Sequence, residues 1–206
     1  MVKEGYWYGL PLVLTSGGLM GVGVYWAGTF FLILALLVLN FFRDPDRRVP
    51  SDTQAVVSPA DGRVVQISEE SFEGRPMRRV SIFMSPLDVH VNRSPVAGTI
   101  RSVTYKKGAF GIASKELASV QNEQNVFTIS GEQGFVVVKQ IAGAVARRIV
   151  FWKRPGDVLG RGERVGLIKF GSRVDVLVDE SVDLRVRLGD RIRAGSSILG
   201  ISRSQA

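Results

Sequence analysis

The hydrophobic positions divide the chain into two stretches with different periods. Residues 9–42 read GLPLVLTSGGLMGVGVYWAGTFFLILALLVLNFF, an uncharged run longer than the roughly 20 residues that one transmembrane helix needs. The run predicts two helical passes, over about residues 6–26 and 28–42, joined by a short turn near Ala27 and Gly28. We therefore expect an N-terminal transmembrane helical hairpin. Because the second run is short, two alternatives to the hairpin with two full passes remain: a single full pass, or a tilted hairpin that does not fully cross the membrane.

Beyond Pro50 the apolar residues occur in short alternating runs, which are typical of β-strands. Gly, Pro, Asp and Asn separate these runs, and only residues 110–121 indicate a helix. About nine strands predict a mainly β domain, a sandwich or a partly open barrel. The runs are AVVSPADGRVVQI, RRVSIFMS, VAGTIRSVTY, NVFTIS, GFVVVKQIAG, RRIVFW, RVGLIKFG, RVDVLV and DLRVRL.

Two segments of this β region are similar to each other: KRPGDVLGRGERVGLI at 153–168 and VRLGDRIRAGSSILGI at 186–201. The repeat resembles the half-motif of biotinyl and lipoyl carrier domains, which implies a barrel-sandwich hybrid fold. A carrier function does not follow, because carriers need a lysine at an exposed hairpin tip. The turn here reads Val178, Asp179, Glu180, Ser181, and no lysine follows Lys169.

Charge separates the same two regions. Lys3 and Glu4 cancel each other and are the only charges in residues 1–42, so the net charge of +8 belongs to residues 43–206. We therefore expect a membrane anchor over 1–42 and a catalytic β domain over 43–206. A basic domain beside an apolar anchor favours anionic lipid headgroups as the partner. No recognition motif supports nucleic acid, the rival partner for a basic surface.

Basic residues also predict an orientation. Lys3 precedes the first apolar run, and Arg43, Arg47 and Arg48 follow the second. The positive-inside rule places both ends in the cytoplasm, so we expect the protein at the cell membrane with its catalytic domain on the cytoplasmic side.

The content of cysteine and histidine limits the chemistry. The chain has no cysteine, which excludes disulfides and thiolate catalysis, and its one histidine is His90. A zinc site would need mostly carboxylate ligands, which zinc sites rarely use. We therefore expect no metal.

Three polar residues stand out among apolar strands: Asp61 in SPADG, His90 in SPLDVHVNRSP and Ser172 in KFGSRVDV. Each has a structural interpretation on its own, as a turn residue, a satisfied buried histidine and a strand bend. Together they are the carboxylate, imidazole and hydroxyl that activate a serine, and a histidine with an ordinary pKa of about 6.5 can act as base at neutral pH. The G-x-S-x-G elbow of the α/β-hydrolases is absent, since Ser172 lies in FGSRV.

Six segments in a fixed order give a more specific indication, and the match to which they belong runs over nearly the whole length of the chain. The chain resembles the short form of the phosphatidylserine decarboxylase proenzymes, with an archaetidylserine decarboxylase-like subgroup included. The segments are FFRDP (41–45), VVSPADG (56–62), FMSPLDVHVNRSPVAG (83–98), NEQN (122–125), KQIAGAVARRIV (139–150) and FGSR (170–173).

The resemblance implies that the bond between Gly171 and Ser172 cleaves itself. The products would be chains 1–171 and 172–206, which stay together as a heterodimer, and Ser172 would become a pyruvoyl group. That group is the implied cofactor for removing CO2 from the serine headgroup of the phospholipid substrate. A homodimer is implied as well.

The resemblance also assigns roles around this bond. His90, oriented by Asp61, is the expected base, and Asp88 is a candidate second carboxylate. Asn122, Glu123 and Asn125 are expected near the site. Longer relatives have a second histidine where this chain has Arg93, and the family's usual N-E-R-N motif has an arginine where this chain has Gln124.

A further group of residues is suited to a headgroup interface. Arg147, Arg148, Lys153 and Arg154 flank Phe151 and Trp152. A solvated basic edge strand with two core aromatics explains the same pattern.

Two other functions fit the residues alone. One is a membrane-tethered serine hydrolase that uses Ser172, His90 and Asp61. The other is a non-catalytic, membrane-anchored barrel module, which would tolerate Ser172→Ala.

Overall fold

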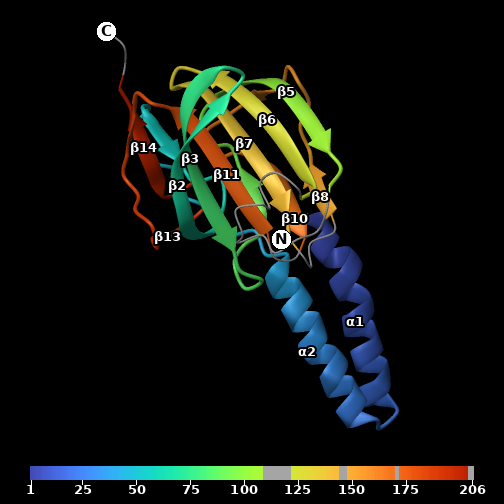
Figure 1. Cartoon of the computed structure of the whole chain (residues 1–206). Helices are drawn as coiled ribbons and strands as arrows, with labels where there is room; N and C mark the ends of the chain where they lie inside the picture. Colours follow the sequence, from blue (N-terminus) through green and yellow to red (C-terminus); the bar gives the residue numbers. More distant parts are fainter. Residues whose placement is uncertain (109–121, 144–147, 170–171, 204–206) are drawn as a thin grey trace. The chain divides into compact units, whose positions relative to one another are not determined.

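The structure of the protein is a computed structural model that describes residues 1–108, 122–143, 148–169 and 172–203 (Figure 1). The chain forms two compact units, Met1–Asp46 and Arg47–Ala206, so the division lies a few residues beyond the expected one at 42. The helix expected over residues 110–121 lies entirely outside the described residues, so it stays a prediction.

The first unit is a pair of antiparallel helices, α1 (Lys3–Gly21) and α2 (Tyr25–Phe41). The helices pack closely where glycines face the partner helix, because a Cβ at Gly9 would lie 2.4 Å from Leu39 and one at Gly28 2.5 Å from Met20. The Ser16 hydroxyl also donates to the Gly28 carbonyl oxygen at 2.8 Å. These contacts join the two helices into a hairpin.

The position of the turn differs from the sequence prediction. The chain reverses between α1 and α2 at residues 22–24, where Gly23 adopts a φ of +84°, a conformation that a residue without Cβ adopts without strain. Gly28 therefore lies inside α2 and serves helix packing. The expected turn near Ala27 and Gly28 is wrong.

Neither helix of the described chain combines the length and the apolar character that crossing a membrane requires. α2 has 17 residues, fewer than the roughly 20 that one span needs. α1 has 19 residues but includes Lys3, Glu4 and the polar stretch around Ser16. The transmembrane hairpin expected from the sequence is therefore not supported.

The second unit is mainly β, as expected, with 14 strands in its described residues. An eight-stranded antiparallel sheet curls into a half-barrel, and two three-stranded sheets accompany it (Figure 1). In spatial order the large sheet contains β13 (Arg191–Ile192), β2 (Gly62–Phe72), β3 (Arg75–Met84), β11 (Ser172–Asp179), β7 (Gly134–Ala142), β6 (Gln124–Gly131), β5 (Gly98–Lys106) and β9 (Val158–Leu159). The small sheets are β1 (Ala55–Val57), β14 (Ile198–Ser202) and β12 (Val182–Leu184), and β4 (Val91–Arg93), β10 (Arg164–Lys169) and β8 (Arg148–Phe151).

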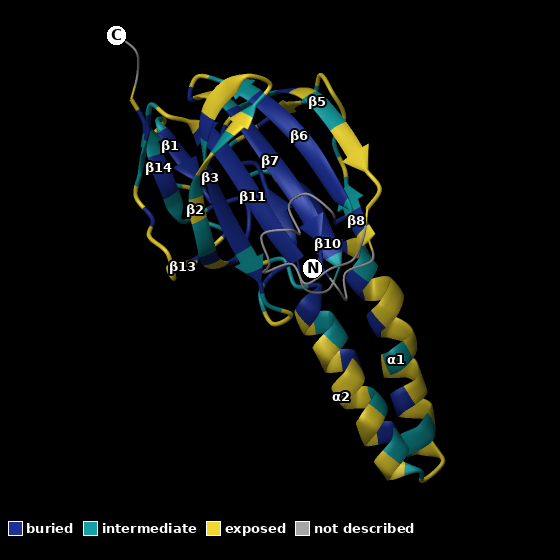
Figure 2. Cartoon of the chain, in the orientation of Figure 1, coloured by how far each residue is buried: buried dark blue, intermediate teal, exposed yellow. Residues whose placement is uncertain are grey.

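The strands β3, β11, β7 and β6 are buried on both faces, which explains their nearly continuous apolar sequences (Figure 2). One face belongs to the main core, in which residues such as Val174 and Val138 pack with Val56, Ile168 and Leu199 of the small sheets. The other face carries a smaller apolar cluster of Met77, Val126, Val137 and Leu177. We call these the core face and the second face of the large sheet.

The internal repeat appears in the structure as a repeated turn. In 154–157 the Arg154 N–H donates to the Asp157 carboxylate at 2.9 Å, and in 187–190 the Arg187 N–H donates to the Asp190 carboxylate at 2.7 Å. In both turns the N–H of the fourth residue returns to the carbonyl of the first. The two similar segments therefore build the same local structure.

Candidate active site

Ser172 is the first residue of β11, the strand that lies between β3 and β7 in the large sheet. It pairs with Met84 on one side and Ala142 on the other, and it is fully buried. Because side chains alternate along a strand, Ser172 shares the core face with Val174 and Val176. Its hydroxyl donates to the Met84 sulfur at 3.3 Å.

A chain of buried neutral side chains leads to this serine. The Asn125 amide donates to Gln140 Oε1 at 3.0 Å, and the Gln140 amide donates to Asn92 Oδ1 at 2.8 Å. Asn92 Nδ2 in turn lies 3.8 Å from the sulfur of Met84, which accepts from Ser172. We call this series, Asn125, Gln140, Asn92 and Met84, the amide chain. It connects three of the sequence motifs to Ser172 through their polar residues.

Asp61 lies just before β2 and is held by two donors. Its Oδ2 accepts from Arg47 Nη2 at 2.7 Å and its Oδ1 from the Ala194 N–H at 2.8 Å. The following glycine lets β2 begin here, because a Cβ at Gly62 would lie 2.2 Å from the Phe83 carbonyl oxygen. Both carboxylate oxygens therefore have partners other than His90.

His90 is held by the backbone of its own loop. Its Nδ1 lies 2.9 Å from the carbonyl oxygen of Asp88, so Nδ1 carries the proton and Nε2 carries the lone pair in the neutral ring. The ring is 2% exposed. The carboxylate of Asp88 caps the loop instead, accepting from the Ser85 N–H at 2.8 Å and from Arg191 at 3.3 Å. The expected hydrogen bond between Asp61 and His90 is not among those of the described residues.

All three candidates nevertheless lie at one end of the large sheet. In the register of β2, β3 and β11, Arg63 is opposite Phe83, and Phe83 is opposite Arg173. Asp61, just before β2, is therefore separated from Ser172 of β11 by two strand spacings, a backbone distance of about 10 Å. His90 approaches from the small sheet, where its carbonyl oxygen accepts from the Ile168 N–H at 3.4 Å, near the end of β10.

The residues expected around the site have structural partners. Arg93 is buried and donates to the Gly162 carbonyl at 3.1 Å. Asn122 donates to the carbonyl of Ala142, the neighbour of Ser172, at 2.7 Å. Glu123 accepts from the hydroxyl of Tyr105, and burial together with this contact raises the pKa of Tyr105 to about 12. Tyr105 therefore stays a protonated donor at neutral pH.

The expected headgroup residues are mostly exposed. Arg148 and Arg154 are exposed, Trp152 is 40% exposed, and Lys153 pairs with Glu163 at 2.5 Å. Arg147 and Gly171 fall outside the described residues. Among the residues that the structure describes, no group of three His, Asp or Glu side chains is arranged to hold a metal ion.

Comparison with known proteins decides between the functions that the residues left open. The family model for phosphatidylserine decarboxylase matches residues 34–200. A phosphatidylserine decarboxylase proenzyme of Solibacter usitatus is 49% identical over 203 residues, which cover 97% of this chain and 95% of that protein. The chain belongs to the phosphatidylserine decarboxylase family. Proenzymes of the same name from Geotalea uraniireducens and Salinibacter ruber are 44% and 47% identical, over 98% and 91% of this chain and 96% and 87% of their own.

Membership in the phosphatidylserine decarboxylase family confirms the resemblance found in the sequence and makes the protein a decarboxylase. It disfavours the serine hydrolase and the non-catalytic barrel module. Sequence reasoning missed four residues of the site: Arg47, Met84, Asn92 and Gln140. Asn92 and Gln140 carry a detectable signal, because each is a polar residue at a core-facing position of a strand within a quoted motif. Arg47 gives no such signal.

Proposed function

We propose that the protein decarboxylates phosphatidylserine to phosphatidylethanolamine with a pyruvoyl group made from its own Ser172. Family membership supports the reaction and the processing of a proenzyme into two chains. The observation that carries the assignment to Ser172 is its position as a fully buried serine that begins the central strand directly after Gly171. The closely related archaetidylserine is the second candidate substrate, because the reacting headgroup is the same.

The proposed self-cleavage requires only the chain and one water. Ser172 Oγ attacks the carbonyl carbon of Gly171, the peptide C–N bond breaks, and an ester and a free amine result. Loss of the α-proton then breaks the Cβ–Oγ bond, which leaves a carboxylate at Gly171 and dehydroalanine at 172. Water replaces the nitrogen, ammonia leaves, and residue 172 becomes a ketone.

The surroundings of Ser172 fit a small neutral carbonyl group. The neighbours that the structure places against its side chain and in register with it are the Met84 thioether and Ala142, and neither carries a charge. When present, the pyruvoyl group supplies an electron-accepting carbonyl that takes up the electron pair left by CO2. Met84 belongs to β3, the strand on one side of this position. Asn122 donates to the Ala142 carbonyl of β7, the strand on the other side.

His90 is the proposed acid and base of the site. Because Nδ1 donates to the Asp88 carbonyl, Nε2 is the atom that can accept a proton from Ser172 and later return one to substrate carbon. We propose that Asp61 acts on this group through the field of its carboxylate and through the loop that it fixes, since its oxygens bind Arg47 and Ala194.

We propose that the enzyme works at the cytoplasmic side of the cell membrane, where its phospholipid substrate lies. The helical hairpin supports this location because it exposes large apolar side chains, among them Trp7 at 80% and Trp26 at 81%. Tryptophan is enriched at the interface between lipid and water. A hairpin that enters only one leaflet would bury these apolar side chains in lipid, and it would not need helices long enough to cross the bilayer. A homodimer of the processed enzyme is part of the same proposal.

A lipid assay tests the proposal. Purified protein is mixed with vesicles that contain phosphatidylserine or archaetidylserine, and release of CO2 and formation of the ethanolamine lipid are measured. We expect the wild type to convert phosphatidylserine and Ser172→Ala to convert neither lipid. Treatment with borohydride and an amine, which reduces a protein-bound carbonyl adduct, should inactivate the wild type. Full activity of Ser172→Ala would contradict the proposal.

A further inference from the structure

Two tight turns at one end of the β domain share a construction and an exposed leucine. In 85–88 the Ser85 N–H donates to Asp88 Oδ2 at 2.8 Å, and in 187–190 the Arg187 N–H donates to Asp190 Oδ2 at 2.7 Å. Each turn is closed by the N–H of its aspartate, which donates to the carbonyl of the first residue. Leu87 and Leu188 project from these turns with 68% and 69% of their surface exposed.

The leucine is not required by the turn itself. The repeat of the second turn at 154–157 has the same hydrogen bonds but carries Pro155 where the second turn has Leu188. Because a proline fits the same position, an exposed leucine there contributes nothing that the turn needs. Leu188 is therefore exposed for a reason other than the geometry of its turn.

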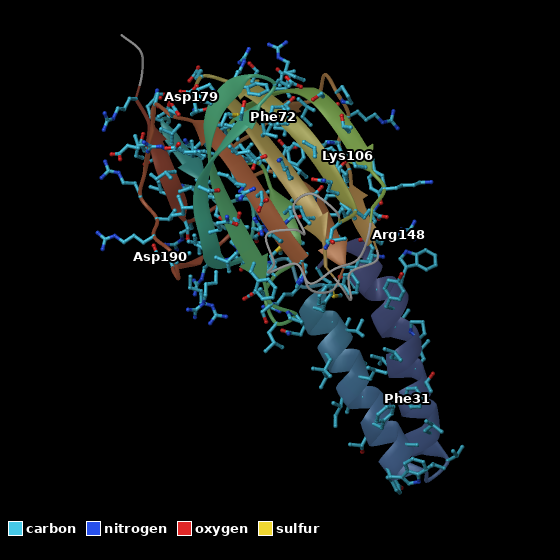
Figure 3. All side chains as sticks on the ribbon, in the orientation of Figure 1. Phe31, Phe72, Lys106, Arg148, Asp179 and Asp190 are labelled. Atoms are coloured by element: carbon cyan, nitrogen blue, oxygen red, sulfur yellow. The ribbon has the colours of Figure 1, made fainter. Side chains whose placement is uncertain are left out.

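An ion pair links the two turns, and backbone hydrogen bonds fix the second turn to the sheet. Arg191 Nη2 donates to Asp88 Oδ1 at 3.3 Å, which joins β13 to the first turn. The second turn is fixed to β2, because the Gly189 N–H donates to the Val64 carbonyl at 2.8 Å and the Val64 N–H to the Asp190 carbonyl at 2.9 Å. Figure 3 shows Asp190 at the opposite end of the β domain from Phe72 and Asp179.

Four exposed arginines lie in the second turn, just after it, or opposite it on β2: Arg187, Arg191, Arg193 and Arg63. Arg63 and Arg191 are directly opposite each other in the pairing of β2 with β13, an arrangement of like charges that weakens a sheet. The nearby carboxylates of Asp88 and Asp190 already accept backbone N–H groups of the turns. The arginines therefore outnumber the available negative charges, and an external anion would relieve their repulsion.

We propose that Leu87, Leu188 and these four arginines form a docking surface for anionic phospholipid headgroups, here called the leucine–arginine surface. Guanidinium groups bind phosphate through paired hydrogen bonds, and leucines between them enter the boundary between headgroups and acyl chains. A single-stranded nucleic acid would instead need aromatic side chains on which its bases stack, and none is among the six residues of this surface.

The surface is connected directly to the candidate active site, so the inference rests on the proposed function. The carbonyl of Asp88, in the first turn, holds Nδ1 of His90 at 2.9 Å. The Ala194 N–H, next to Arg193, holds Asp61 at 2.8 Å. Seating the surface on a bilayer would therefore bring the segments that carry both candidate residues to the level of the headgroups.

Local fluorescence on the full chain tests this surface separately from catalysis. The chain has no cysteine, so Leu87→Cys and Leu188→Cys each provide a single attachment point for an environment-sensitive dye. Ser71→Cys is the matched control, because Ser71 is exposed on the same β2 strand about 25 Å from Arg63. The vesicles contain phosphatidylglycerol with phosphatidylcholine, or phosphatidylcholine alone, and neither contains a serine headgroup.

We expect dyes at 87 and 188 to shift their emission to shorter wavelengths with the phosphatidylglycerol vesicles, and the dye at 71 to stay unchanged. Because the dyes report local contact, binding through the helical hairpin does not mask the result. In the Leu188→Cys background, Arg187→Ser and Arg191→Ser should each weaken the preference for phosphatidylglycerol vesicles by about fivefold, and Lys at either position should retain most of it.

Three results would overturn the proposal: no shift at 87 and 188, an equal shift at 71, or an equal shift with a single-stranded RNA in place of vesicles. Failure of the proposed function looks different. A wild-type protein that releases no CO2 from phosphatidylserine would contradict decarboxylation, while the phosphatidylglycerol experiment would still report whether the surface binds lipid.

Discussion

The two faces of the large sheet carry polar side chains of opposite character, although the same strands supply both. On the core face Ser172 contacts the neutral amide chain of Asn125, Gln140, Asn92 and Met84. On the second face the next residue, Arg173, donates to Asp175 at 2.6 Å and to Ser81 at 2.6 Å, and both members of the pair are buried. One step along β11 therefore separates neutral from ionic surroundings.

Farther along the second face, Glu70 of β2 pairs with Arg79 at 2.8 Å and with Lys139 of β7 at 2.5 Å. These three side chains line a cavity of about 670 Å³ that does not include Ser172. Charges on this face thus connect strands that are not neighbours in the sheet. The core face carries no comparable ion pair among the described residues of the amide chain.

The proposed chemistry explains why the surroundings of Ser172 are neutral and those of Arg173 are ionic. In the proposed self-cleavage Ser172 loses its hydroxyl, which costs its neighbours one weak hydrogen bond to sulfur. Losing one member of a buried ion pair costs about 3–5 kcal/mol instead. A residue that is converted chemically is therefore best placed among neutral partners. If the chain is cleaved before Ser172 as proposed, the ion pair of Arg173 and Asp175 would keep the new end of β11 attached to the sheet.

Breaking the ion pair beside the site should have the largest effect. Asp175→Asn removes the carboxylate that pairs with the buried Arg173 at 2.6 Å, so we expect the free energy of unfolding to fall by about 3–5 kcal/mol. Denaturant unfolding of Ser172→Ala, which stays one chain, measures this without interference from cleavage. The double change Arg173→Met with Asp175→Leu should recover much of the loss. Equal stability of Asp175→Asn and its parent would contradict the structural role of the pair.

Breaking the amide chain should have a smaller effect on stability and a specific one on cleavage. Gln140→Met keeps the volume but removes the partner of both Asn125 and Asn92, which should cost about 1–3 kcal/mol. We also expect self-cleavage to slow, because Asn92 positions Met84 against Ser172. Electrophoresis of freshly synthesised protein follows the fraction cleaved over time. The control is Lys139→Met, at the residue of β7 just before Gln140, whose side chain points to the second face. If both variants cleaved at the same rate, the amide chain would have no special role.

The smallest effect concerns pH. Burial alone would raise the pKa of Glu70, but hydrogen bonds and charges from Lys139 and Arg79 outweigh it and lower the pKa below 4.5. A lowered pKa in the folded state stabilises the protein above the pKa of the unfolded state, and this contribution is lost as pH falls through the folded value. Glu70→Gln should therefore be less stable at pH 7 by no more than about 1 kcal/mol, and the difference should shrink as pH falls through the lowered pKa of Glu70 in the folded state. Thermal unfolding at pH 7 and at pH 3 compares the two.

The sequence predicted features that depend on local pattern. Alternating runs indicated the strands, and the repeat at 153–168 and 186–201 indicated the paired turns. The motif containing Ser172 indicated the candidate nucleophile. Features that depend on distant contacts were not predictable. The partner of Asp61 is Arg47, which lies in the segment that joins the two units. The ring of His90 is held by a backbone carbonyl, and because every residue has one, the sequence does not indicate this contact. The turn at Gly23 was missed because several glycines nearby gave the same local signal.

The central claim is that the chain cleaves itself before Ser172 and converts that residue. Intact mass spectrometry of purified wild type and Ser172→Ala tests it most directly. We predict that the wild type gives chains of residues 1–171 and 172–206, the second about 17 Da lighter than its encoded mass because a ketone replaces the amine. Ser172→Ala should remain a single chain of 206 residues. An active wild-type preparation that consists of one uncleaved chain would contradict the account.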